Sequence, residues 1–379
     1  MRHLSADQIL LPNGQFASGM TLILDDQGVV VDVIPGSEPT SEHHHGRIIP
    51  GCINAHCHLE LSHMKGMIPE GGGLSQFLKD IISNRKQAPV EEQAAATTWD
   101  TRMWEAGIQA VGDICNTQTT YPVKAVSRIR YHNLIEQFGL DPSKASIRYD
   151  QAVQLHAASK ALGIPSSIVP HAPYSVSELL YDHIRNGFEP QTDIWSIHFL
   201  ESASEQELIQ SGTGPMKSMY VEMGIINETY QGEQLTATQK ILKHIPTAGK
   251  ILLVHNTYVT ADDIKTLKDS GRFHDMWFCL CPSANLYIEG RLPNVPMMRD
   301  EGCQLVVGTD SLASNHQLSI AHEVHLLHQH FPEIPLAECW SWATLNGAKL
   351  YGWNDLGAFE KGRRPGVVLV NDGYATRLA

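Results

Sequence analysis

The sequence predicts an α/β protein: a distorted (β/α)8 TIM barrel with a small composite β-sandwich formed by both ends of the chain. Three observations support this prediction. Apolar runs of about five to eight residues alternate with long stretches of helical periodicity, as in parallel strand–helix units. There are eight such runs, the number that closes a barrel, and several end in a histidine or an aspartate. A chain of 379 residues can hold such a barrel and a smaller attached unit.

The first 50 residues alternate as short strands. A turn at Asp25–Gly28 between two apolar runs is typical of a hairpin. We expect strands at 8–11, 19–24 and 29–34. His43, His44 and His45 fall in a polar stretch, where we expect a solvated loop whose histidines bind metal only adventitiously.

The barrel is expected at residues 51–358, and the composite unit at 1–50 and 359–379. Ala337–Leu350 has the pattern of a helix that follows the barrel, and Val367–Val370 that of a final strand beside the N-terminal ones. The predicted barrel strands are 53–58, 108–115, 133–137, 167–171, 194–198, 251–255, 276–281 and 304–308.

Residue types that bind metals stand at the ends of these predicted strands. His56 and His58 are two residues apart on the first strand, so their side chains leave the same face. Neutral imidazole is a common ligand of zinc and iron. Four further strands end in or near His171, His198, His255 and Asp310. Because the carboxyl ends of barrel strands converge on one mouth, we expect these side chains to meet there.

Composition and charge argue against several classes of function. The net charge is −13 without a dense basic cluster, so nucleic acid is not an expected partner. No apolar run reaches the roughly 18 residues that span a bilayer. Met1–Asp7 shows no signal-peptide pattern, so we expect a cytoplasmic protein. The 7 cysteines lack Cys-x-x-Cys spacing and are expected as buried thiols, with Cys57 pointing away from the paired histidines.

Several motifs follow one another along nearly the whole chain. They are the Pro-Gly-x-Ile-Asn-Ala-His-x-His opening at 50–58, His-Ala-Pro-Tyr at 171–174, His-x-x-Glu at 198–201, Cys-Pro-Ser-Ala-Asn at 281–285 and Gly-x-x-x-Lys-Gly-x-x-Pro-Gly at 357–366. In this order they resemble the amidohydrolase superfamily. The resemblance is to its aromatic aminohydrolase branch, which includes methylthioadenosine/S-adenosylhomocysteine, aminodeoxyfutalosine and guanine deaminases and chlorohydrolase-like proteins.

The resemblance and the convergence of strand ends select the same metal site. His56, His58 and His198 would be neutral ligands, and Asp310 an anionic one. Binuclear members of the superfamily carry a carboxylated lysine where this chain has His171, so we expect one divalent ion, zinc first, with iron and manganese as alternatives. Such an ion lowers the pKa of bound water from ~15.7 toward ~7. The resulting hydroxide would attack a trigonal carbon of the substrate while Asp310 accepts the proton.

Two further residues are assigned to catalysis. Glu201 is expected in a loop that turns inward, where it would shuttle protons to a ring nitrogen and to the departing amine. The alternatives for Glu201 are a contact with the N-terminus of a helix near Ser204 and a solvated surface acid. His255 is expected to hydrogen bond to the attacking water or to the tetrahedral centre. Taken alone, His255 would be a core histidine.

Substrate binding is assigned to His171, Tyr174, Glu60 and Glu136. For the two glutamates, a buried ion pair with lysine or arginine is an equal alternative. His63 is also expected at the mouth. The histidines within 322–330 lack the His-Glu-x-x-His spacing of zinc proteases, and we expect a polar helix face or a subunit contact there. The resemblance suggests a homodimer.

The leading hypothesis is hydrolytic deamination of a small molecule, an aminated purine nucleoside such as a 5′-substituted adenosine, aminodeoxyfutalosine included. One alternative is the same attack with another leaving group, as in halide release from a chlorinated triazine or opening of a cyclic amide. A second alternative, of a different class, is a catalytically inactive scaffold of the same fold. The complete set of metal-binding and acid–base residues argues against that scaffold.

Overall fold

The barrel strands form two parallel sheets in the computed structural model, which describes residues 1–36, 41–85 and 88–379. Every predicted barrel strand is present, with ends that differ from the predicted ones by at most about three residues. These eight strands are β6 (Cys52–His58), β7 (Ile108–Cys115), β8 (Arg130–Gln137), β9 (Ser166–Pro170), β10 (Ile194–Phe199), β11 (Lys250–His255), β12 (Met276–Leu280) and β13 (Gln304–Val307). A short strand that was not predicted, β14 (Asp310–Ser311), follows β13.

Backbone hydrogen bonds between the two sheets close the barrel. One sheet has the order β14-β6-β7-β8-β9 and the other the order β10-β11-β12-β13. The amide of His198 donates to the carbonyl of His171 at 2.9 Å, and the amide of Thr309 donates to the carbonyl of His56 at 3.1 Å. At Gly308 an added Cβ would lie 2.8 Å from the His56 carbonyl oxygen, so this close approach requires glycine.

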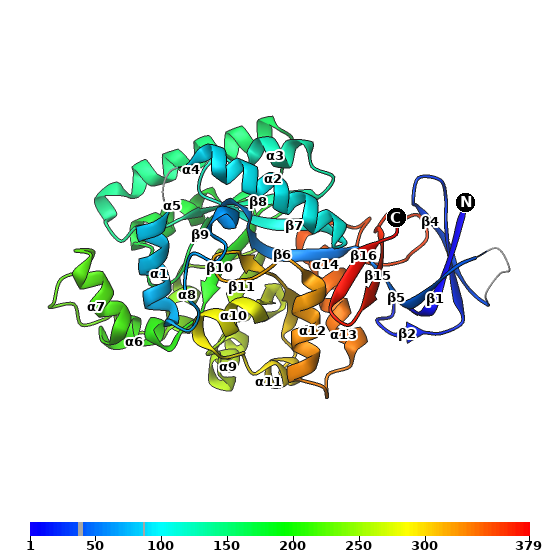
Figure 1. The fold of residues 1–379 in the computed structure, drawn as a ribbon. Helices are drawn as coiled ribbons and strands as arrows, with labels where there is room; N and C mark the ends of the chain where they lie inside the picture. Colours follow the sequence, from blue (N-terminus) through cyan, green and yellow to red (C-terminus); the bar gives the residue numbers. More distant parts are fainter. Residues whose placement is uncertain (37–40, 86–87) are drawn as a thin grey trace.

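Helices surround the barrel (Figure 1). They are α1 (Gly73–Asn84), α2 (Pro89–Glu105), α3 (Tyr121–Val126), α4 (Ala145–Ala161), α5 (Glu178–Gly187), α6 (Ala203–Ser211), α7 (Gly214–Glu222), α8 (Ala237–His244), α9 (Ala261–Asp269), α10 (Pro282–Glu289), α11 (Val295–Asp300), α12 (Ile320–His330), α13 (Leu336–Ser341) and α14 (Gly347–Tyr351). Short segments of other helix types are η1 (Leu59–Met64), η2 (Pro142–Lys144), η3 (Phe273–Asp275) and η4 (Trp342–Asn346). None of the helices in these described residues has the length and apolarity needed to span a membrane.

Apolar side chains fill the interior of the barrel. They belong to one apolar cluster, to which the barrel strands contribute side chains such as Ala55, Ile114, Leu134, Val169, Leu252, Val254, Cys279 and Val306. A packed interior leaves room for chemistry only at the ends of the strands, and in barrels of this kind the site lies at the carboxyl ends.

Strands from both chain ends share a third sheet beside the barrel, seen in Figure 1 as blue and red strands. The strands are β1 (Arg2–Leu10), β2 (Phe16–Ala17), β3 (Met20–Leu24), β4 (Val30–Pro35), β5 (Glu42–Pro50), β15 (Val367–Asn371) and β16 (Tyr374–Arg377). Their order is β16-β15-β5-β1-β3-β4, with β2 paired to β1. The predicted union of the two chain ends is confirmed as one mixed sheet, in which β5 is parallel to β1 and antiparallel to β15.

One local prediction was wrong, and another was right except in helix type. His43, His44 and His45 lie in strand β5 rather than in a loop, because β5 pairs with β1 along this polar stretch. The helix predicted at 337–350 is present as the contiguous segments α13, η4 and α14, of which η4 is π-helical. Within it, the Thr344 hydroxyl donates to the Trp340 carbonyl, which competes with the regular helical pairing.

Candidate metal centre

Four buried side chains from three strands meet at the carboxyl end of the barrel. His56 and His58 come from β6, and His198 comes from β10. Asp310 comes from β14, which pairs with β6 so that Asp310 lies opposite Cys57. One ligand atom of each of the four side chains lies within 4.8 Å of the others. The structure therefore assembles the predicted ligand set.

The spacing of the donor atoms suits a single ion. The Nε2 atoms of His56 and His58 are 3.1 Å apart. Asp310 Oδ1 lies 3.6 Å from the first of these nitrogens and 3.3 Å from the second. Two donors bound tetrahedrally to one zinc ion at about 2.1 Å would lie about 3.4 Å from each other. The observed separations are close to that value.

The protonation states of the histidines also suit a metal. The Nδ1 atom of His198 lies 2.8 Å from the carbonyl oxygen of His171. A carbonyl can only accept, so Nδ1 carries the hydrogen and Nε2 keeps its lone pair. Burial lowers the pKa of His58 well below its ordinary value and the pKa of His198 to about 4. Both imidazoles are therefore neutral at physiological pH.

Asp310 supplies the negative charge of the set. Burial alone would raise the pKa of Asp310, but the hydrogen bond with His56 and the nearby His58 and His255 outweigh it and hold that pKa well below the ordinary range. The Ser314 hydroxyl donates to Asp310 Oδ2 at 2.5 Å, which leaves Oδ1 facing the imidazoles. Neutral imidazoles with one carboxylate are a donor set that fits a divalent cation.

Glu201 and His255 lie next to one another beside this ligand set. The Nε2 atom of His255 is 3.5 Å from Glu201 Oε1, and its ring centroid is 5.3 Å from that of His198. Burial, and then the nearby carboxylates of Asp310 and Glu205, raise the pKa of Glu201 well above its ordinary value. Burial lowers the pKa of His255 well below its ordinary value. The shifts favour the protonated carboxyl of Glu201 beside the neutral imidazole of His255.

The backbone is strained where these side chains leave their strands. Leu200, His255 and Asp310 have φ angles of +46°, +76° and +56°, and Asn256 has +58°. Residues other than glycine rarely adopt this left-handed region, and such outliers cluster at functional sites. Here they follow β10 and β11 and open β14, the three strand ends from which His198, Glu201, His255 and Asp310 point into the mouth. Sequence patterns carry no signal for this strain.

His171 and Tyr174, which were predicted to bind substrate, lie at one side of the metal centre. The His171 ring centroid is 4.8 Å from that of His198 and 5.8 Å from that of Tyr174. The His171 Nδ1 atom is 2.7 Å from the Ser175 hydroxyl. The buried Tyr174 hydroxyl has no hydrogen-bond partner among the described residues. Phe138, missed in the sequence, is 42% exposed and packs edge-on against His171.

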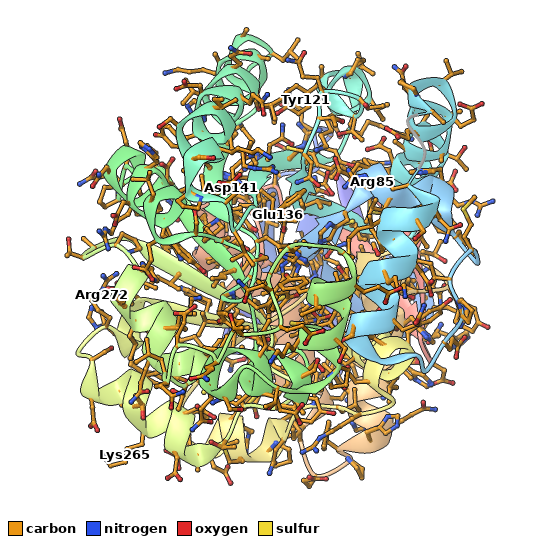
Figure 2. The ribbon with its side chains drawn as sticks, turned by 90° about the vertical axis from the view of Figure 1, so that its left-hand side faces the viewer. Arg85, Tyr121, Glu136, Asp141, Lys265 and Arg272 are labelled. Atoms are coloured by element: carbon orange, nitrogen blue, oxygen red, sulfur yellow. The ribbon has the colours of Figure 1, made fainter. Side chains whose placement is uncertain are left out.

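Glu60 adopts the alternative considered for it, a buried ion pair. Its Oε1 accepts from Arg85 Nη2 at 2.7 Å, and its Oε2 accepts from the Asn116 amide at 2.8 Å. Glu136 is different, because its Oε1 has no hydrogen-bond partner among the described residues and lies 3.5 Å from His198 Nδ1. Arg85 and Glu136 lie close together in Figure 2, and the side chain of Asn116 bonds to both. Sequence reasoning missed Arg85 and Asn116, which stand in loops without a motif.

The remaining candidates lie outside the ligand set. Cys57 belongs to β6 but pairs with Asp113 of β7, and burial raises the pKa of its thiol well above the ordinary value. His63 places Nδ1 3.1 Å from the carbonyl oxygen of Glu60. The histidines of 322–330 lie on α12, where His330 Nδ1 is 2.9 Å from the Leu326 carbonyl oxygen.

Comparisons with known proteins agree with this architecture. Residues 47–377 match the model of the amidohydrolase family. An adenosine deaminase from Helicobacter pylori is 24% identical over 84% of this chain and 77% of its own length. A 5-methylthioadenosine/S-adenosylhomocysteine deaminase from Bacillus cereus is 24% identical over 87% of this chain and 74% of its own.

Solved structures share the fold over nearly the whole chain. The Helicobacter pylori aminofutalosine deaminase in complex with methylthio-coformycin has a TM-score of 0.82 at 21% identity, covering 98% of this chain and 93% of that one. The atrazine chlorohydrolase from Arthrobacter aurescens complexed with zinc has a TM-score of 0.75 at 17% identity, covering 97% and 86%. With its barrel, its terminal mixed sheet and its buried His-His-His-Asp metal site, the chain belongs to the amidohydrolase family.

Proposed function

We propose that this chain is a zinc-dependent deaminase that hydrolyses the amino group from the ring of a purine nucleoside. The substrate class is a 5′-substituted adenosine, aminodeoxyfutalosine included. The observation that carries the proposal is the position of Glu201 and His255 beside His56, His58, His198 and Asp310. Acid, imidazole and metal ligands are the groups that hydrolysis of an aromatic amine requires.

The donor set supports zinc as the cofactor. Three imidazole nitrogens and one carboxylate oxygen are ligands that zinc binds readily, with iron(II) and manganese as alternatives. The related atrazine chlorohydrolase structure contains zinc. When bound, the ion supplies Lewis acidity that makes hydroxide available near neutral pH.

The chain's own residues then move the protons. Asp310 accepts the proton that water loses as its oxygen bonds to the amino-bearing carbon. Glu201, protonated beforehand, donates to the neighbouring ring nitrogen, and His255 hydrogen bonds to the added oxygen. Glu201 next takes the proton of the new hydroxyl group and delivers it to the amine. The carbon–nitrogen bond breaks, ammonia leaves, and the proton held by Asp310 restores Glu201.

The purine preference rests on the mouth and on the relatives. His171, Tyr174 and the exposed Phe138 form an aromatic wall next to His198, which suits a flat ring. The free Oε1 of Glu136 can accept a hydrogen bond from a sugar hydroxyl or an amine. Relatives named as adenosine, methylthioadenosine/S-adenosylhomocysteine and aminodeoxyfutalosine deaminases favour the nucleoside.

Ammonia release from a panel of substrates tests the proposal. The panel holds adenosine, 5′-methylthioadenosine, S-adenosylhomocysteine, aminodeoxyfutalosine, guanine, a chlorinated triazine and a cyclic amide, each offered to zinc-loaded protein, with halide release and ring opening measured for the last two. We expect turnover of at least one 5′-substituted adenosine and inosine-type products by mass spectrometry. Metal content is measured on the same sample, so that a lack of ammonia release cannot be ascribed to protein without bound metal.

Two outcomes would overturn the proposal. Halide release from the triazine, or opening of a cyclic amide, without any nucleoside turnover would assign the same site to another leaving group. If no substrate of the panel is turned over and the protein takes up no stoichiometric zinc or iron, an inactive scaffold is favoured. A homodimer and a cytoplasmic location stay predictions, to be checked by light scattering and by cell fractionation.

A further inference from the structure

Three potential metal donors lie together on the terminal sheet, away from the barrel mouth. His43 and His45 are two residues apart on β5, so their side chains leave the same face of the sheet. Asp7 stands on β1, the parallel neighbour of β5. The exposed side chains of Asp7, His43 and His45 have donor atoms within 4.8 Å of one another.

An irregular strand pairing aims the carboxylate at the two imidazoles. The register between β1 and β5 shifts after the Ala6–His44 pair and resumes at Gln8–Arg47, so β5 contains one extra residue. Gly46 in this bulge has a φ of +124°, and an added Cβ would collide with the Asn371 side chain. The Gly46 amide donates to Asp7 Oδ2 at 2.8 Å, which leaves Oδ1 for the histidines.

The separations are those of ligands around one ion. Asp7 Oδ1 lies 3.6 Å from His43 Nε2 and 3.7 Å from His45 Nδ1. These distances exceed a normal N–H···O hydrogen bond of about 2.7–3.2 Å. They are close to the ~3.4 Å between two donors on a tetrahedral zinc ion. His43 Nδ1 lies 3.1 Å from the Ser5 hydroxyl, which keeps Nε2 on the side of Asp7.

We propose that Asp7, His43 and His45 form a second metal site, for a divalent ion of borderline character such as Zn²⁺, Cu²⁺ or Ni²⁺. Two imidazole nitrogens and one carboxylate oxygen are ligands that these ions prefer, and water completes the coordination because the cluster is open to solvent. The site is separate from the buried metal centre and does not depend on the proposed deamination.

Because Asp7 lies on β1 and the two histidines lie on β5, a bound ion would stabilise the terminal sheet. It would join β1 to β5 beside β15, the C-terminal strand, because the Asn371 side chain of β15 donates to the His45 carbonyl at 3.0 Å. An ion that binds the folded sheet and not the unfolded chain raises the melting temperature, and the stabilisation grows with the logarithm of the ion concentration once that concentration exceeds Kd. The site would thus tie together the sheet formed by the two chain ends.

Equilibrium dialysis of the zinc-loaded protein against rising free Zn²⁺, with metal counted by mass spectrometry, tests the proposal. The wild-type chain is compared with the H43A/H45A double variant and with His44→Ala. His44 stands between the two ligands and leaves the opposite face of β5, so it is a matched control. We expect one more ion per chain in wild type and H44A than in H43A/H45A.

A second variant, Asp7→Asn, distinguishes loss of the metal ligand from unfolding of the terminal sheet. Asp7→Asn keeps an acceptor for the Gly46 amide but removes the charge, so weaker uptake of the second ion is expected with hydrolytic activity unchanged. The proposal is overturned if no second ion binds to wild type. It is also overturned if H43A/H45A retains the second ion, which would assign that ion to other exposed histidines.

Discussion

The Nε2 atom of His255 lies 3.5 Å from the Oε1 atom of Glu201, and both side chains are buried beside the metal ligands. His255 is the last residue of β11, and Glu201 follows the neighbouring parallel strand β10, so both lie at the barrel mouth. Burial moves their pKa values in opposite directions, upward for the carboxyl of Glu201 and downward for the imidazole of His255. Both shifts favour the uncharged form of each group, which suits Glu201 as a proton donor.

Glu201→Gln should lower kcat by about 10²- to 10⁴-fold, the usual contribution of a general acid. Glutamine has the shape of the protonated carboxyl, so metal content and melting temperature should stay close to those of wild type. The measurements are steady-state kinetics and metal analysis. Glu207→Gln, at an exposed acid of the same region, serves as the control. Wild-type kcat in E201Q would remove Glu201 from the mechanism.

Removal of the buried ion should abolish activity and destabilise the fold. His56, His58, His198 and Asp310 then lose the ion that their donor atoms surround. An ion at 100 times its Kd contributes about 2.7 kcal/mol. Thermal unfolding before and after chelation, and after return of zinc, measures the effect. The H43A/H45A variant should still lose activity and stability on chelation, because the barrel ligands are intact, whereas an unchanged melting temperature in that variant would contradict a stabilising ion in the barrel.

Glu205 should make stability depend on pH. Its carboxyl accepts hydrogen bonds from the Leu200 and Glu201 amides, yet burial raises its pKa from 4.5 to about 8, with Lys240 lowering and Asp263 raising it. The folded chain thus holds a proton that the unfolded chain releases near 4.5. The contribution is complete below pH 4.5 and is lost as pH rises toward 8, with a slope of at most about 1.4 kcal/mol per pH unit.

Urea unfolding at several pH values measures this dependence. Glu205→Gln cannot titrate, so its stability should vary less between pH 4.5 and 8 than that of wild type. Glu207→Gln, which changes an exposed carboxyl of α6, should keep the wild-type slope. Parallel curves for wild type and E205Q would show that Glu205 titrates normally in the folded chain.

The buried pair of Lys124 and Asp113 should be costly to break. Lys124 Nζ lies 2.5 Å from Asp113 Oδ2, and both side chains are fully buried. Asp113 Oδ1 also accepts from the Leu59 amide, next to His58. Lys124→Met leaves an uncompensated charge and should cost about 3–5 kcal/mol of unfolding free energy.

A double-mutant cycle separates the charge from the packing at this pair. Adding Asp113→Asn to K124M should recover part of the lost free energy, because no buried charge then lacks a partner. Chemical unfolding of wild type, both single variants and the double variant gives the coupling energy. Additive effects of the two substitutions would mean that the pair does not interact in solution.

Strand ends were the most predictable part of the site. Apolar runs locate buried strands, and the residue that follows a barrel strand faces the mouth, so His56, His58, His198 and Asp310 could be selected from the sequence. Arg85 and Asn116 could not be selected, since they stand in loops and their partners come from other strands. The sequence predicts a loop at histidines 43–45, because their polar composition conceals a strand whose pairing partner, β1, lies far away in the sequence.

The sequence by itself determined the barrel, the union of both chain ends and the identity of the metal-binding residues, because these depend on periodicity and on the order of motifs. Only the tertiary structure decided that Glu60 pairs with Arg85, that Glu136 Oε1 has no hydrogen-bond partner in the described part of the chain, and that Asp7 faces the histidines of β5. The physical reason is that a hydrogen bond or an ion pair depends on distances of a few ångströms between distant residues. Those distances are set by packing of the whole chain, and no local pattern records them.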